Sequence, residues 1–321
     1  MPQPSSSTTL QRADLGMVAY EYMLEAADRG FIGSSIFPIF DVNEQSADYP
    51  VIPIEAILKL KDTTRSVGGN YNRDDYDFET GTYACFEYGW EERVGDDERN
   101  LYARFYDLDE VAVKRAIDVL MRQHEYRVSS AVFNTSNVTN TAAVTTEWST
   151  AASATPYNDV IGGKEALYAA TGVMANRMAI SWKVFMNILK TAELKDAFKY
   201  TSPSEIKNDA VKRQMLADYF GVEQLYVGNA IKDGVKKGQT YSLEYMWDDE
   251  YCLLFKGSDS MNLKDPQLGR TFLYTKDTPD IITTEQYREE QTRADIFRVR
   301  HYTDEAFIFT GAGYLLSNIT A

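Results

Sequence analysis

Few side chains in this sequence belong to the types that commonly carry acid–base or metal chemistry. The chain contains two histidines, His124 and His301, and two cysteines, Cys85 and Cys252. Neither histidine has cysteines or carboxylates at the spacing of a zinc site. His124 falls on the apolar face of a predicted helix, where a hydrogen-bonded core histidine is the expected role. We therefore expect no metal site, and no motif supports a histidine-activated nucleophile.

Three pairs of adjacent acids could supply the two carboxylates that a hydrolase needs. They are Glu91–Glu92, Asp96–Asp97 and Asp248–Asp249. Adjacent acids in loops are usually solvated turn residues, so no catalytic residue is assigned. The alternative, a soluble cytoplasmic hydrolase that uses a carboxylate pair, predicts a species of one to a few subunits with a deep acidic pocket.

Two glycine-containing stretches lack the spacing that phosphate binding requires. Gly311-Ala312-Gly313 is followed by Leu316 where a dinucleotide motif has its third glycine. Gly162-Gly163-Lys164 is followed by Glu165 where a phosphate-binding loop has serine or threonine. We interpret both as turn or cap glycines and expect no cofactor.

Composition narrows the class of protein further. The 321 residues carry a formal net charge of −15, which argues against tight, non-specific nucleic-acid binding by the whole chain. No apolar run is long enough to cross a bilayer, and the first residues contain no apolar signal core. Two cysteines indicate a reducing compartment. The 22 tyrosines beside two histidines suit interfaces better than acid–base chemistry.

The longest predicted helix runs from Asp107 to about Phe133. Asp107 and Glu110 form the pattern of a capping box at its start. One apolar stripe follows the helical period: Val113, Ile117, Leu120, Met121, His124, Val128 and Val132. Such a long helix with one stripe is expected to act as a strut, and the stripe should pack on the strands near 297–309.

Before this helix, residues 48–95 alternate in two extended runs around a tip rich in Gly, Asn and Asp. This predicts a wide hairpin that cannot bury itself on its own chain, which indicates partner contacts. Residues 1–47 begin with a polar arm, contain a short helix that ends at Gly30, and continue as an extended segment from Phe31.

After the long helix, residues 134–157 are predicted to be a connection or short polar strands. A second lobe then begins near Asn158, with a short helix that ends at Gly172, a strand that ends at Ser181, and a helix after Ser181. A further helix is predicted to begin at Ser202, with Glu205 completing a capping box.

The last third of the chain is predicted to be mostly strands, with turns at Asp248-Asp249 and at Thr303-Asp304. Arg298 and Arg300 fall on one face of a predicted strand. This basic stripe has two interpretations: it docks against another subunit's carboxylates, or it is an ordinary solvated strand face.

The order of these segments resembles the tailed-bacteriophage major capsid proteins of the Hong Kong ninety-seven type, in the branch described as major capsid protein E-like. The segments that carry the resemblance are 31–42, 63–100, the long helix, 176–201, 215–230, 268–274 and 293–319. The resemblance implies an α+β fold. Its parts would be an arm and lead-in (1–47), an extended hairpin loop (48–95), a peripheral domain with a spine helix (96–157), an axial α/β domain (158–285) and returning strands of the peripheral domain (286–321).

The resemblance also implies a structural role without catalysis. Hexamers and pentamers of the chain would form an icosahedral shell around double-stranded DNA, in the host cytoplasm during assembly and then in the virion. Partners would be a separate scaffolding protein, a portal and a decoration protein, with no membrane. Another virion module, such as a decoration or tail-tube subunit, is the second alternative. We expect an acidic or neutral inner face, which would repel packaged DNA.

Overall fold

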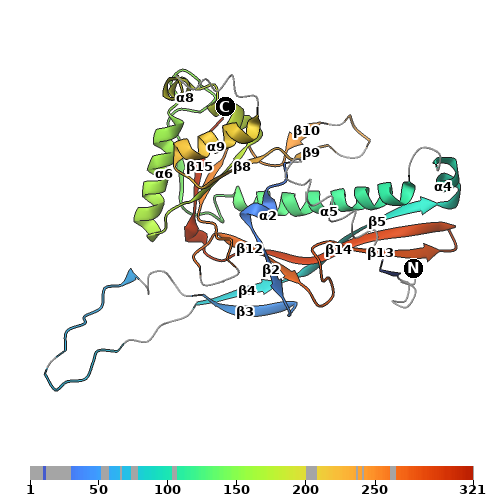
Figure 1. Ribbon diagram of the computed structural model, residues 1–321, viewed down its shortest axis with the longest axis horizontal. Coiled ribbons are helices and arrows are strands. Elements are labelled where there is room, and N and C mark those ends of the chain that lie inside the picture. Colours follow the sequence, from blue (N-terminus) through green and yellow to red (C-terminus); the bar gives the residue numbers. More distant parts are fainter. Residues whose placement is uncertain are drawn as a thin grey trace.

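The computed structural model describes residues 10–11, 30–51, 58–65, 67–73, 79–102, 107–199, 208–235, 238–240, 242–260 and 265–320. Its helices and strands form a six-stranded and a five-stranded sheet with two smaller strand pairs, and a hairpin projects from one end (Figure 1). One hydrophobic core joins α5 to both large sheets, and a second core lies within the five-stranded lobe. The predicted short helix before Gly30 and the predicted capping residues Ser202 and Glu205 lie outside the described residues.

The predicted long helix is α5, Leu108–Val132. Asp107 is its N-cap, and its side chain accepts a hydrogen bond from the backbone N–H of Asp109 at 2.9 Å. The reciprocal half of the predicted capping box is wrong, because Glu110 accepts from Lys114 instead, at 2.5 Å. All seven residues of the predicted apolar stripe are buried.

A six-stranded sheet lies against α5. Its strands are β1 (Leu10–Gln11), β2 (Ile39–Val42), β5 (Phe86–Gly95), β12 (Gly269–Tyr274), β13 (Thr283–Glu289) and β14 (Ala294–Phe307). The order is β1-β13-β14-β12-β2, and β5 pairs with β14 from the other side. Ile117 and Leu120 share one core with Phe297 and Val299, which confirms that the stripe packs on the returning strands.

The predicted turn at Thr303-Asp304 is wrong, because β14 continues through both residues. Thr303 pairs with Leu273 of β12 and with Phe86 of β5. Polar residues that suggest a turn stay extended here because neighbouring strands on both sides satisfy the backbone hydrogen bonds.

A five-stranded sheet forms the second lobe. Its strands are β6 (Thr141–Ala143), β7 (Arg177–Ser181), β8 (Gln224–Gly228), β11 (Cys252–Phe255) and β15 (Gly313–Ser317), in the order β6-β15-β11-β7-β8. The helices around it are α6 (Pro156–Thr171), α7 (Trp182–Ile188), α8 (Ala192–Ala197) and α9 (Asp209–Phe220). Every residue of β7 and β11 is buried, as expected for strands covered on both faces.

Several helix boundaries in this lobe differ from the predictions. α6 begins at Pro156, so Gly162 and Gly163 lie inside a helix and are neither turn nor cap residues. An added Cβ at Gly163 would lie 2.9 Å from Leu254 of β11, so glycine allows the helix to approach the sheet closely. α9 begins after Asn208, whose extended backbone and capping side chain interrupt the single helix predicted from Ser202.

The hairpin is built from β3 (Ser46–Val51) and β4 (Glu79–Ala84), which pair in antiparallel register. The predicted second arm was one alternating run. It is in fact two strands, because the chain leaves the hairpin at Cys85 and continues into the six-stranded sheet as β5. Before the hairpin, the expected extended segment contains one helical turn, α2 (Gly33–Ile36).

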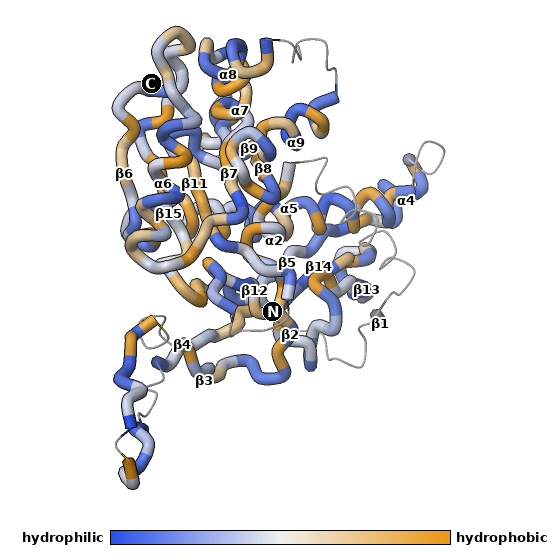
Figure 2. Tube along the Cα trace, turned by 60° about the vertical axis from the view of Figure 1, so that its left-hand side comes forward, coloured by the Kyte–Doolittle hydropathy of each residue, from blue (hydrophilic) through white to orange (hydrophobic). Residues whose placement is uncertain are grey.

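Sheet membership also crosses the ranges that the resemblance implied. β12 and the start of β13 precede residue 286 yet belong to the six-stranded sheet, whereas β15 follows it yet belongs to the five-stranded sheet. The chain therefore passes between the two lobes several times. Figures 1 and 2 show an elongated molecule in which the loop between β3 and β4 stands apart from both lobes. Hydrophilic and hydrophobic positions are interspersed along this loop (Figure 2). Within the described residues, no helix combines the length and apolar character needed to span a membrane.

Candidate functional site and interaction surfaces

The fold separates the acids that were considered as catalytic pairs. Glu91 and Glu92 are neighbours on β5, so their side chains leave opposite faces of the sheet. Glu91 accepts from Arg298 at 2.7 Å, whereas Glu92 lies 3.8 Å from Arg115 of α5. Each acid therefore has its own basic partner.

The other two pairs are also divided between different structural roles. Asp96 begins α4 (Asp96–Tyr102) and accepts two hydrogen bonds from Arg288, which lower the pKa of this carboxyl. Asp249 pairs with Lys183, and Asp248 accepts from the backbone N–H of Glu250. The predicted turn at Asp248-Asp249 lies between β10 (Leu243–Tyr245) and β11.

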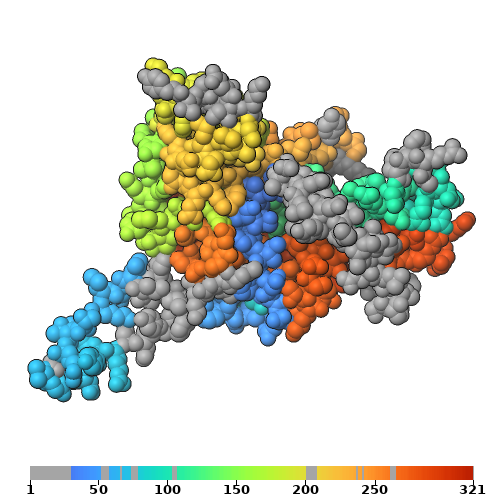
Figure 3. All heavy atoms as spheres, viewed as in Figure 1, coloured from blue at the N-terminus to red at the C-terminus, as the bar shows by residue number. Residues whose placement is uncertain are grey.

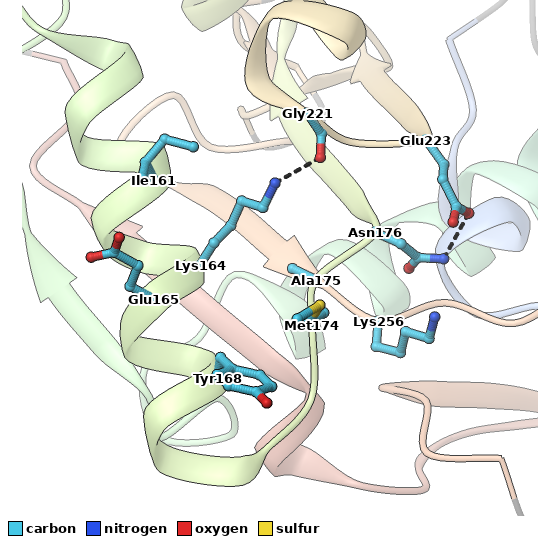
Figure 4. Close-up of a pocket in the computed structure, with 10 residues that line it drawn as sticks. All are labelled: Ile161, Lys164, Glu165, Tyr168, Met174, Ala175, Asn176, Gly221, Glu223 and Lys256. Carbon is cyan, nitrogen blue, oxygen red and sulfur yellow. Dashed lines mark hydrogen bonds between the residues drawn. The ribbon is translucent and has the colours of Figure 1, made fainter.

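Two hollows of more than 500 Å³ are lined by described residues. The first, about 570 Å³, lies between α6 and the ends of β7 and β8. Figure 4 shows its two acids, Glu165 and Glu223, on opposite sides, with Glu223 held by Asn176 at 2.9 Å. The exposed side chains of Tyr168 and Met174 line it, and Lys164 donates to the carbonyl of Gly221 at 2.6 Å. A carboxylate pair needs both groups beside one reacting bond, which this hollow does not provide.

The second hollow, about 590 Å³, lies between α5 and the small hairpin of β9 (Ile231–Asp233) and β10. Its lining includes Glu244, Asp248 and Asp249, but Asp249 already forms an ion pair with Lys183. Among the described residues, no group of three His, Cys, Asp or Glu side chains could hold a metal ion.

Both cysteines are free and buried. Burial raises the pKa of the Cys85 thiol to about 12 and raises the pKa of Cys252 as well. A thiol of this kind is not a nucleophile at neutral pH, because the reactive form is the thiolate.

The two histidines meet in the seam between α5 and β14. His124 is 1% exposed and His301 is fully buried, and their ring centroids are 6.2 Å apart. Arg127 joins the seam through two hydrogen bonds to Glu305, both 2.9 Å long. The prediction that His124 is a hydrogen-bonded core histidine is confirmed, because its Nε2 atom lies 3.5 Å from the hydroxyl of Thr271.

Beside this seam, Glu125 occupies a buried position that the sequence analysis missed. Its carboxylate accepts from the backbone N–H groups of Ile32 and Gly33, both at 2.8 Å, and from Nε1 of Trp247 at 2.7 Å. Burial raises its pKa to about 7 although these three donors act in the other direction. The available signal was helical spacing, since Glu125 lies four residues after the buried Met121.

The arginine stripe on β14 is paired within the chain. Arg298 bonds to Glu91, and Arg300 donates to Glu285 at 2.8 and 3.0 Å. Both side chains point away from α5, because residues 297, 299 and 301 face the helix. Of the two interpretations, docking on another subunit's carboxylates is therefore the weaker, since each guanidinium already has a carboxylate partner.

Two exposed surfaces of opposite charge lie at opposite ends of the molecule. The described part of the hairpin loop, residues 58–73 without 66, carries four basic residues against one acid. Its side chains at Leu60, Val67 and Tyr71 are between 70% and fully exposed. We call this segment the basic loop; Figure 3 shows it standing out from the body of the molecule.

The other end is formed by β5 and the start of α4. Residues 86–99 carry six acids against two basic residues, and we call this segment the acidic end. Four of these acids, Glu87, Glu91, Glu92 and Asp96, already pair with arginines of β14, α5 and β13. It also exposes Phe86 and Trp90 at 61% and 46%. Within the described residues, β5 pairs only with β14, so its outer backbone edge is open. Exposed aromatics beside an open strand edge are typical of interaction surfaces.

Comparison with known proteins was made at two levels. No protein-family model and no curated protein matches the sequence. Among solved structures, a phage-related protein from Bordetella bronchiseptica matches 97% of this chain and 98% of its own, with 20% identity and a TM-score of 0.71.

Two further structures show what kind of fold this is. The capsid structure of cyanophage P-SCSP1u matches 89% of this chain and 87% of its own, with 9% identity and a TM-score of 0.59. An encapsulin from Synechococcus elongatus matches 89% and 86%, with 11% identity and a TM-score of 0.52. The chain therefore has the fold of phage capsid proteins and encapsulins, the Hong Kong ninety-seven type that its segment order resembled.

Proposed function

We propose that this chain is the major capsid protein of a tailed bacteriophage and assembles into an icosahedral shell. The observation that carries the proposal is the match to shell-forming chains over nearly the full length, with no large part of the chain left over for another activity. The divided acids and buried thiols described above add support, because they offer no reactive centre.

Within this proposal, the parts of the subunit take the roles that the resemblance implied. The six-stranded sheet with α5 is the peripheral domain, and α5 is its spine. The five-stranded sheet with α6 to α9 is the axial domain, whose tips meet at the centres of hexamers and pentamers. The hairpin is the extended loop that lies over a neighbouring subunit, and the amino-terminal arm also reaches a neighbour.

The two charged ends support a head-to-tail contact between subunits. In our proposal the basic loop of one copy docks on the acidic end of the next. A contact between two different patches of the same chain closes into a ring when its rotation allows, which is how hexamers and pentamers arise. Opposite charges steer such an encounter, and the exposed aromatics supply apolar area.

The shell in this proposal encloses double-stranded DNA without gripping it. A net charge of −15 supports this arrangement, since an acidic subunit repels phosphates. A separate scaffolding protein and a portal complete the assembly, with a decoration protein on the outside.

Electron microscopy of the expressed chain, alone and with its phage partners, tests the proposal. Closed shells or capsomers support it, and nuclease-protected DNA inside assembled particles distinguishes a capsid from an encapsulin-like protein container. A chain that stays monomeric under all these conditions and turns over a substrate would show that the proposal is wrong.

Charge reversal in the basic loop tests the head-to-tail contact. We expect Lys59→Glu with Lys61→Glu and Arg65→Glu to reduce the rate of shell formation by at least about tenfold at low salt, because repulsion replaces steering at the encounter. Light scattering against ionic strength measures this. The matched single-charge comparison is Lys59→Glu against Lys276→Glu, an exposed lysine between β12 and β13, and only the first should slow assembly. Equal loss in both variants would mean that total charge, and not this contact, controls assembly.

A further inference from the structure

The only two histidines of the chain lie together in one buried seam, although they are far apart in sequence. His124 comes from the middle of α5, and His301 comes from β14, which the helix covers. Ring centroids 6.2 Å apart leave no room for solvent between two rings that are at most 1% exposed. Histidine is the side chain whose ordinary pKa lies closest to neutral pH.

The geometry favours a neutral His301. Its Nε2 atom lies 3.4 Å from Nη2 of Arg127. A guanidinium has only N–H donors, and Nη2 also donates to Glu305 at 2.9 Å and to Thr303 at 3.2 Å, so Nε2 can only be the acceptor of an N–H that it shares with one of these. Protonation would place an N–H on Nε2, directly opposite the N–H of Arg127, and would add a second positive charge beside the first.

One carboxylate of the described residues, that of Glu305, faces both rings; it lies 3.6 Å from Nε2 of His124 and must be shared with Arg127. The charged and titratable groups that face the two rings are Arg127 of α5, Glu305 of β14 and Tyr88 of β5. Glu305 already accepts two hydrogen bonds from Arg127 and one from Thr303. The ring of Tyr88 lies 3.8 Å from the Arg127 guanidinium and offers no negative charge at neutral pH.

The nearest other acids point elsewhere. Asp304 leaves the opposite face of β14, where it accepts from the backbone N–H of Ala84 at 2.9 Å. Glu125 is directed at the backbone of Ile32 and Gly33. Acidification therefore adds up to two positive charges to a seam that holds one balanced ion pair.

We propose that this seam is an acid-sensitive lock, in which protonation of His301 and His124 separates the middle of α5 from residues 301–305 of β14. Burial supports opening at acidic pH, because it disfavours the protonated form of both rings. It lowers the pKa of His124 to about 4 and lowers the pKa of His301 well below its ordinary value. The lock is therefore closed at neutral pH. Its stabilisation is complete above pH 6.5, where unfolded histidines lose their protons, and is lost as the pH falls towards the folded pKa values.

Opening the lock would reach the root of the hairpin. Asp304 lies within the stretch that moves, and it holds the amide of Ala84 at the end of β4. Burial raises the pKa of Asp304, so this carboxylate also takes up a proton as the pH falls and becomes a weaker acceptor. The inference concerns the single subunit and holds whether or not the chain forms shells.

Histidine NMR titration of the unassembled wild-type subunit tests the lock directly, since the chain has two histidine signals. We expect neither signal to titrate above pH 5 while the subunit is folded. The variant Lys190→His adds an exposed histidine as an internal control, and its signal should titrate near pH 6.5. If either native histidine titrated near pH 6.5 in the folded subunit, the lock would not exist.

A second test uses the variant His124→Gln with His301→Gln, which keeps acceptors in the seam but removes the titration. We expect the folding equilibrium constant of the wild type to fall between pH 6.5 and 4.5 by up to about 100-fold per histidine relative to this variant. Urea unfolding at each pH measures the ratio. We also expect exchange of the Ala84 amide, corrected for its intrinsic pH dependence, to accelerate more at pH 5 in the wild type than in the variant, where Asp304 titrates but the seam does not. If the ratio of the two folding equilibrium constants did not change across this pH range, the proposal would be overturned. If the variant does not fold, the NMR titration of the wild type decides alone.

Discussion

At the scale of single residues, the most informative side chains are ionisable, buried or partly buried, and placed on one turn of α5. His124, Glu125 and Arg127 each hold a different part of the subunit: β12, the lead-in segment at residues 32–33, and β14. A buried polar group must be hydrogen-bonded to avoid a large desolvation cost. Because each partner occupies a fixed place, these three residues define one register of the helix on the sheet, which an apolar stripe alone would leave less specific.

Glu125 supplies a prediction with a defined sign. Its folded pKa of about 7 lies above the ordinary value of 4.5, so the folded chain binds a proton that the unfolded chain releases between these values. Stability should therefore fall as the pH rises from 4.5 to 7. We expect Glu125→Gln to remove this dependence, so that the wild type loses on the order of 1–3 kcal/mol relative to the variant across that range.

Urea unfolding of both proteins at several pH values measures this difference, in which the opposite contribution of the histidines cancels. A difference that stays constant with pH would mean that the three N–H donors outweigh burial and keep the carboxylate ionised throughout.

At the scale of elements, α5 joins the lead-in, the six-stranded sheet and the β9–β10 hairpin. Arg122 reaches that hairpin through a 2.7 Å hydrogen bond to the carbonyl of Ile231. The sequence predicted this helix well because capping residues and a period of three to four are local signals. It did not predict the single 14-residue strand β14, whose continuity depends on β5 and β12 at its sides.

A pair of substitutions on one helix tests the role of α5. Ile117 is fully buried and Val111 is 37% exposed. We expect Ile117→Asp to cost about 4 kcal/mol or more, enough to prevent folding and therefore assembly, because it buries an unpaired charge. The control Val111→Asp keeps the same residue type at an exposed position and should change stability by less than about 1 kcal/mol. Circular dichroism and thermal unfolding distinguish the two, and normal shells from the Ile117 variant would contradict the spine assignment.

At the scale of the whole molecule, the hairpin is the part whose charged and apolar loop side chains are left most exposed by the rest of the chain. Its base is anchored, since Tyr49 and Tyr83 pack with Phe272 in a small separate core. Its loop exposes both charge and apolar side chains at the end opposite to the acidic surface. A part that is firmly rooted and openly exposed is suited to contact another copy.

Shortening the hairpin tests this role. Val51 and Glu79 pair across β3 and β4, so replacing residues 52–78 with Asn-Gly would join them through a two-residue turn. We expect a folded subunit that remains unassembled, because the core around Phe272 is retained and the docking loop is lost. Sedimentation velocity and near-ultraviolet circular dichroism measure the two properties. Closed shells from this variant would show that the loop is not needed for assembly.

The sequence by itself determined the features that depend on local order. The long helix, its buried stripe and the hairpin follow from spacing, capping and turn residues. The α+β class came from the resemblance of the segment order to shell proteins. Tertiary structure alone decided which strands share a sheet, that Arg298 and Arg300 are paired, that Glu125 holds the lead-in, and that His124 meets His301. These contacts join residues far apart in the chain, and no local pattern encodes the partner that a buried charge finds when two lobes fold around one helix.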